Sequence, residues 1–135
     1  FVSARRKARK SALDFLYEAD LRSTSALLLH RARPESALSE SEYVAELLEG
    51  VELHKVKIDE CIQLYAQNWE LDRIPAVDRN LMRIAIFEIV FNGDIPDSVA
   101  ISEAVELAAE LSTENSAEYI NGVLGRISSI KSSLI

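Results

Sequence analysis

The sequence predicts an all-α fold of about six or seven helices. Apolar residues recur at helical spacing along most of the chain, and no run of useful length alternates as a half-buried strand does. Glycine is scarce, with 4 in 135 residues, and no linker-like composition divides the chain. A length of 135 residues fits one domain over 1–135, with a basic arm at 1–10 and a helical body at 11–135. The pattern is compatible with two small bundles that share a central helix.

The first predicted helix covers residues 4–21, where five apolar residues fall on one face: Ala8, Ala12, Phe15, Leu16 and Ala19. A short apolar cluster at 26–29 follows and is expected to end at Pro34. Residues 39–42, Ser-Glu-Ser-Glu, have the pattern of a capping box and are expected to open a long helix. We expect a possible break in that helix near Gly50.

Pro75 stands at the entry to a helix over 76–91 that is apolar on nearly every side, which is typical of a central, buried helix. Asn92 and Gly93 are expected to cap its C-terminus, and 94–97 to turn into a helix that ends near residue 111. Residues 115–118 resemble an N-terminal cap. The last helix then places Ile120, Val123, Leu124, Ile127 and Ile130 inward.

Charge is distributed unevenly along the chain. The whole sequence carries a formal net charge of −7, whereas its first ten residues carry five cations and no acid. The remaining 125 residues hold 10 basic and 22 acidic side chains. An acidic body with a short basic arm predicts one local contact with phosphate, and a remainder that repels nucleic acid or attracts a basic partner.

The arm places its cations at the start of a helix, where they oppose the helix dipole: Arg5, Arg6, Lys7, Arg9 and Lys10. Phosphate binding gives a reason for that placement, because guanidinium groups grip phosphate through two hydrogen bonds. A solvated basic terminus is an equally weighted alternative. On a helical wheel, Arg6, Lys10, Leu13 and Tyr17 form an outward ridge, and Arg5 and Arg9 flank the apolar face.

The aromatic ring of Tyr17 beside these cations suits stacking on an unpaired base. Packing of Leu13 and Tyr17 against another helix is the alternative, and we weight the two equally. We predict that Arg6→Ala combined with Arg9→Ala weakens RNA binding without lowering the melting temperature.

Catalytic and metal-binding patterns are weak. His30 and His54 lie far apart without ligand spacing, and Cys61 occupies an apolar helical position that favours a buried, inert thiol. No phosphate-binding loop, dinucleotide turn or nucleophile elbow is present, so we expect no enzyme, metal or cofactor. Apolar runs are too short to cross a bilayer. One cysteine and no visible signal peptide predict a cytoplasmic protein.

Charged residues also stand in the central helix. Asp78 lies in its first turn, where the helix dipole favours an acid, so capping alone would explain it. Arg79 and Arg83, one turn apart, are expected to pair with Asp78 or Glu88.

Four segments in order resemble the bacterial NusB family of transcription antitermination factors. They are ARRKARKSALDFLY at 4–17, VDRNLMRIAIFE at 77–88, IP with ISEAVELA at 95–108, and YINGVL at 119–124. The resemblance implies two three-helix bundles and an RNA-binding role without catalysis. It also implies binding of the boxA element of ribosomal RNA leader transcripts together with NusE, a small-subunit ribosomal protein, within the RNA polymerase antitermination complex.

The resemblance further assigns residues. It places the RNA contact on Arg5, Arg6, Lys7, Arg9, Lys10, Asn115 and Tyr119; at Asn115 many relatives carry Asp. It places the partner contact on Tyr17 and Asp78, with Leu13 beside them on the predicted ridge. Two alternatives stay open: an RNA-recruitment domain related to ribosomal RNA methyltransferases, and a protein-binding homodimer with Leu13 and Tyr17 across its interface.

Overall fold

The computed structural model describes residues 4–33, 38–66 and 70–133, without the side chains of 38–41. This part of the chain is all-α, as predicted, and holds no strand. Its seven α-helices are α1 (Ala4–Arg22), α2 (Ala26–Arg31), α3 (Leu38–Leu53), α4 (Lys55–Tyr65), α5 (Ala76–Ile86), α6 (Asp97–Leu111) and α7 (Ser116–Ile130). Short helical turns are η1 (Leu71–Arg73), η2 (Phe87–Phe91) and η3 (Lys131–Ser133).

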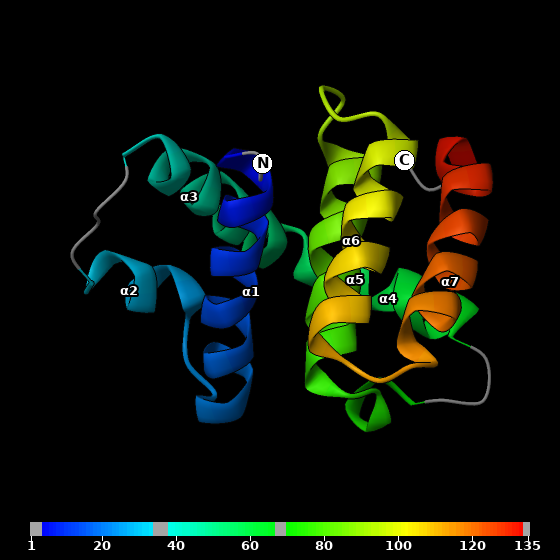
Figure 1. Ribbon diagram of the computed structural model, residues 1–135, viewed down its shortest axis with the longest axis horizontal. Coiled ribbons are helices and arrows are strands. Elements are labelled where there is room, and N and C mark those ends of the chain that lie inside the picture. The colour runs from blue at the N-terminus through cyan, green and yellow to red at the C-terminus, as the bar shows by residue number, and fades with distance from the viewer. Residues whose placement is uncertain (1–3, 34–37, 67–69, 134–135) are drawn as a thin grey trace.

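The helices form two groups that lie side by side (Figure 1). Helices α1, α2 and α3 pack together in one group, and α4, α5, α6 and α7 pack together in the other. The groups meet where α1 packs against α5 and where α3 packs against η2. Helix α4 therefore extends the second group beyond three helices.

Helix α5 and the π-helical turn η2 that continues it form the centre of the fold, as the apolar pattern predicted. Every residue at positions 80–90 is buried. The segment ends at Asn92, the expected position, but through a different cap. Gly93 does not adopt a left-handed backbone; instead the Asn92 side chain accepts a hydrogen bond of 3.1 Å from the Asp94 amide.

Two other predicted helix boundaries differ from the structure. Helix α3 begins at Leu38, one residue before the predicted cap Ser39, and the side chains of the predicted capping box at 39–41 lie outside those described. The expected end of the second segment at Pro34 falls outside the described residues, and α2 ends at Arg31. The cap that α2 does have is Ser25, whose hydroxyl accepts a hydrogen bond from the Leu28 amide.

Gly50 allows the ring of Phe87 to pack closely against α3. The helix break expected near Gly50 occurs four residues later, at His54 between α3 and α4. A Cβ atom at Gly50 would overlap the buried ring of Phe87 on η2. We therefore expect Gly50→Ala to lower the free energy of unfolding by about 1–2 kcal/mol, because overpacking outweighs the gain of up to about 1 kcal/mol in helix propensity. Urea denaturation measures this change. The solvent-exposed Gly122→Ala in α7 is the control; equal or higher stability of Gly50→Ala contradicts the argument.

The predicted pairing of Arg79 and Arg83 with Asp78 or Glu88 is wrong. Both arginines pair with acids on other helices. The Arg79 guanidinium lies 2.8 Å from the carboxylate of Asp20 on α1, and the Arg83 guanidinium lies 2.8 Å from that of Asp59 on α4. Burial alone would raise the pKa of Asp20. Hydrogen bonds from Arg79 and Asn80 outweigh it, and together with the charge of Arg83 they hold the pKa below its usual value. The contacts with Asp20 join α1 to α5, and the contact with Asp59 joins α4 to α5.

The single thiol lies in the core. Cys61 is buried, as predicted, and burial raises its pKa. None of the helices described here is long and apolar enough to cross a membrane.

Candidate nucleic-acid interface

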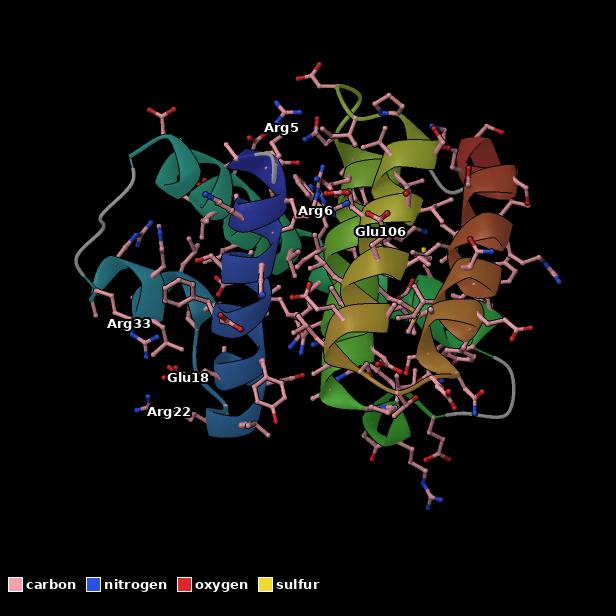
Figure 2. The ribbon with its side chains drawn as sticks, viewed as in Figure 1. Arg5, Arg6, Glu18, Arg22, Arg33 and Glu106 are labelled. Atoms are coloured by element: carbon pink, nitrogen blue, oxygen red, sulfur yellow. The ribbon has the colours of Figure 1, made fainter. Side chains whose placement is uncertain are left out.

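The five cations of the arm fall into three environments along the first turns of α1. Arg9 is buried, Arg6 and Lys10 face α6, and Arg5 and Lys7 are exposed. Figure 2 shows Arg5 and Arg6 at the end of α1 that lies beside the start of α6. The five cations form one cluster in the sequence, whereas their surroundings in the fold differ.

Arg9 is buried in this fold and joins helices together, and its assignment to RNA stays a prediction. Its side chain is 4 % exposed, and its Nε and Nη2 donate to both oxygens of Glu88 at 2.9–3.0 Å. Tyr43 donates to the same carboxylate, and Arg9 Nη1 donates to Glu103. Burial would lower the pKa of Arg9, but Glu88 raises it. The proposed Arg6→Ala/Arg9→Ala test therefore would lower stability as well as binding.

Arg6 and Lys10 form ion pairs with an acidic face of α6. Arg6 donates to Glu103 and Glu106, and Lys10 Nζ lies 3.0 Å from Glu110. Hydrogen bonds from Arg6 hold the pKa of Glu103 below its usual range. The two helices run in the same direction in Figure 1, so successive turns of α1 meet successive turns of α6.

Arg5 and Lys7 remain open to a ligand. Neither forms an ion pair within the described ranges, and both side chains are exposed. The guanidinium of Arg5 lies 4.8 Å from the ring centre of Tyr43, which orients the cation without neutralising it. Arg5 and Arg6 also line a surface cleft of about 540 Å3 with Pro96 and Val99 at the start of α6. Two carboxylates, Asp94 and Glu103, also line this cleft, so an anionic strand is favoured only along its Arg5 and Arg6 side.

The outward ridge predicted for α1 is only partly present. Leu13 is 3 % exposed, so its placement on the surface is wrong. α1 is covered on two sides, by α3 and by α5, and the buried sector is wider than the wheel suggests. Tyr17 is 39 % exposed, as predicted. Leu21 on the same helix and Leu111 at the end of α6 are also exposed.

The remaining predicted residues meet at the opposite end of the second group. Asp78, Asn115 and Tyr119 line one pocket of about 430 Å3 with Ile74 and Pro75. Asn115 is the exposed N-cap residue of α7, although its side chain makes no capping hydrogen bond. Tyr119 is partly buried, and burial raises its pKa, with a contribution from the charge of Asp78. Residues assigned to RNA and to a partner thus share one pocket, away from the arm (Figure 1).

Asp78 is buried and lines this pocket with a carboxylate that has partners inside the protein. Its carboxylate accepts hydrogen bonds from the hydroxyls of Ser112 and Ser116, the second at 2.7 Å. The dipole argument explains its place in the first turn of α5. It does not predict these contacts, which hold the turn between α6 and α7.

Sequence reasoning missed the acids that hold the arm: Glu88, Glu103, Glu106 and Glu110. The signal for Glu88 is its place in an otherwise apolar buried segment, where a carboxylate requires a partner. The other three occur at helical spacing, which also fits a solvated face. Nowhere in the described residues do three or more histidine, cysteine or acidic side chains form a group able to hold a metal ion.

Comparison with known proteins gives consistent matches. The model of the NusB family matches residues 6–129. A transcription antitermination protein NusB from Beutenbergia cavernae is 50 % identical over 137 residues, which cover 93 % of this chain and 90 % of that protein. The structure of T. maritima NusB has a TM-score of 0.86 at 32 % identity and 96 % coverage of this chain and 93 % of that one. A crystal structure of the antitermination factors NusB and NusE with double-stranded RNA shares the fold, with a TM-score of 0.81, 24 % identity, and coverage of 96 % and 98 %.

Proposed function

Because this chain belongs to the NusB family, we propose that it is a transcription antitermination factor that binds boxA-type leader RNA together with NusE. In this role it promotes processive elongation by RNA polymerase, which places it in the cytoplasm. It acts by binding and without catalysis; its relatives are named as antitermination proteins, not as enzymes. The observation that carries the RNA contact is the exposed Arg5, which lines the cleft at the start of α6, with Lys7 as a second exposed cation on the same turns of α1.

We place the phosphate contact on Arg5 and Lys7, with Arg6 and Lys10 joining when their acidic partners are displaced. The pocket at Asn115 and Tyr119 is a second RNA contact. There the partly exposed ring of Tyr119 can stack on an unpaired base, and the Asn115 amide can donate to it. A strand that touches both regions passes along the second helix group, with the arm at one end (Figure 1).

The partner contact belongs on the exposed apolar side chains Tyr17, Leu21 and Leu111. A ribosomal protein is normally basic, and the body outside the arm holds 22 acidic against 10 basic residues, so charge favours the encounter. NusE is the proposed occupant because a NusB of the same fold has been crystallised with NusE and RNA. Leu13 lies one turn before Tyr17 on α1 and is buried, so its side chain belongs to the core and not to this contact.

The alternatives are less well supported. The relative from Beutenbergia is a NusB of which this chain covers 90 %, which favours an antitermination factor over a domain of a methyltransferase. A homodimer with Leu13 across its interface conflicts with the burial of that side chain. Sedimentation at micromolar concentration, with and without RNA, tests whether Tyr17 still pairs two copies.

RNA binding with salt dependence tests the proposed function. We expect a short single-stranded boxA RNA to bind with log K falling against log salt at a slope of roughly −2 to −3.5, because about 3 to 5 phosphates are neutralised. Fluorescence anisotropy across a salt series measures the slope. Added NusE should tighten binding of this RNA and not of a scrambled RNA of equal length. A flat salt response contradicts the phosphate contact, and equal binding of both RNAs with NusE contradicts the antitermination role.

A further inference from the structure

An acidic face of α6 lies directly against the arm. Its members are Glu103, Glu106 and Glu110, which stand three and four residues apart and so share one side of the helix. Because α1 and α6 run in the same direction, this face meets Arg6 and then Lys10 as the helices proceed (Figure 1).

The three acids are not equivalent. Glu103 is 13 % exposed and accepts from both Arg6 and Arg9, so it belongs to the buried joint between the helices. The side chains of Glu106 and Glu110 are 54 % and 55 % exposed. Their ion pairs with Arg6 and Lys10 lie at the surface, where another anion can reach the cations. Figure 2 shows Arg6 and Glu106 pointing toward one another.

We propose that Glu106 and Glu110 are internal competitors of RNA for Arg6 and Lys10. In the RNA-free protein their carboxylates occupy the donors that phosphates use, and a bound strand displaces them. This inference rests on the proposed function, in which the arm holds RNA. The two acids thereby hold the RNA affinity below the value that the cations of the arm would otherwise give.

The chemistry of the two anions supports this exchange. A carboxylate and a phosphate accept the same hydrogen bonds from a guanidinium or an ammonium group, and only one can fill a given donor pair. An exposed ion pair of this kind lowers a competing affinity by roughly 1.4- to 5-fold, the equivalent of its 0.2–1 kcal/mol. Two such pairs together allow roughly 2- to 25-fold, and we take the middle of this range, roughly 3- to 10-fold, as the expected effect.

The test is Glu106→Gln/Glu110→Gln, which removes both charges and keeps side-chain size. We expect this variant to bind short single-stranded boxA RNA about 3- to 10-fold more tightly than the native protein at about 0.1 M salt, with a gain that shrinks toward 1 M as screening weakens the pairs. The matched control is Glu49→Gln/Glu60→Gln, which changes net charge equally on α3 and α4. Both control acids are exposed and form no ion pair in the part of the chain that is described. We expect the control to gain less than 2-fold.

A double-mutant cycle adds a readout that net charge does not move. Arg6→Ala should weaken binding more in the Glu106→Gln background than in the native protein, because the native arginine must first give up its bond to Glu106, whereas its bonds to Glu103 are the same in both backgrounds. Melting temperatures establish that each variant is folded. If the native protein binds RNA but Glu106→Gln/Glu110→Gln gains no more than the control, the competitor inference alone is overturned. If neither the native protein nor any of the variants binds RNA, the proposed function itself is contradicted.

Discussion

Replacing Glu88 by glutamine is expected to lower the free energy of unfolding by about 3–5 kcal/mol, because the change removes the main counter-ion of the buried Arg9 and leaves only its single hydrogen bond to Glu103. The Glu88 side chain is 1 % exposed, and that of Arg9 is 4 % exposed. Arg9 makes three hydrogen bonds to this carboxylate at 2.9–3.0 Å, and Tyr43 makes another. Glutamine keeps the volume but offers one acceptor oxygen and no charge to donors that remain in place.

Urea denaturation of Glu88→Gln and of the exposed control Glu60→Gln measures the effect. The control should stay within about 0.5 kcal/mol of the native protein, as surface substitutions usually do. Arg9→Leu combined with Glu88→Leu should cost less than the sum of the two single changes, since neither charge is then left alone. A loss for Glu88→Gln no larger than that of the control contradicts the role assigned to this pair.

The network also explains how the arm is held. Arg9 joins α1 to η2 through Glu88 and to α6 through Glu103, while Tyr43 brings α3 to the same carboxylate. Burial and the hydrogen bond to Glu88 raise the pKa of Tyr43, so its hydroxyl keeps its proton and donates. The first turns of α1 are therefore anchored to three other elements, and the exposed Arg5 and Lys7 extend from an anchored helix. Such preorganisation lowers the entropic cost of binding a flexible strand.

The helices were predictable because their signal is local. The apolar spacing of α1, α6 and α7 and the all-round apolar pattern of α5 are visible within a few turns. Arg9 and Leu13 show where local reasoning ends: both lie near the edge of the apolar sector, and α3 and α5 together decide how wide that sector is. The sequence contains Glu88, but nothing near it indicates a partner 79 residues away.

Gly50 and the acids of α6 illustrate the same limit. A glycine inside a helical pattern favours a break by propensity, and only the ring of Phe87 shows that close approach is the reason for it. Glu106 and Glu110 have the spacing of a solvated face, and only the course of α1 beside α6 gives them partners. Long-range packing, which a single sequence does not display, decides these roles.

Removing the two open cations is expected to weaken RNA binding most among the variants of the arm. We expect Arg5→Ala/Lys7→Ala to lower the affinity for short single-stranded boxA RNA by about 10- to 100-fold, since a hydrogen bond between charged groups contributes about 1.5–3 kcal/mol and part of that is lost to solvent at an exposed site. Unlike Arg9, neither residue takes part in the buried network, so the melting temperature should not change. The salt slope should become less steep by about 1.4, or 0.7 for each phosphate released from contact.

Lys55→Ala/Lys57→Ala on α4 is the matched control, because it removes the same charge from exposed positions distant in sequence from the arm. If overall charge governed binding, both variants would lose affinity equally and both slopes would change. A local contact predicts a loss confined to Arg5→Ala/Lys7→Ala. Anisotropy over a salt series separates these outcomes, and thermal melting of the same samples shows whether any loss comes from unfolding. The body outside the arm is acidic, so overall charge does not attract the strand, and the phosphate contact depends on individual side chains on α1.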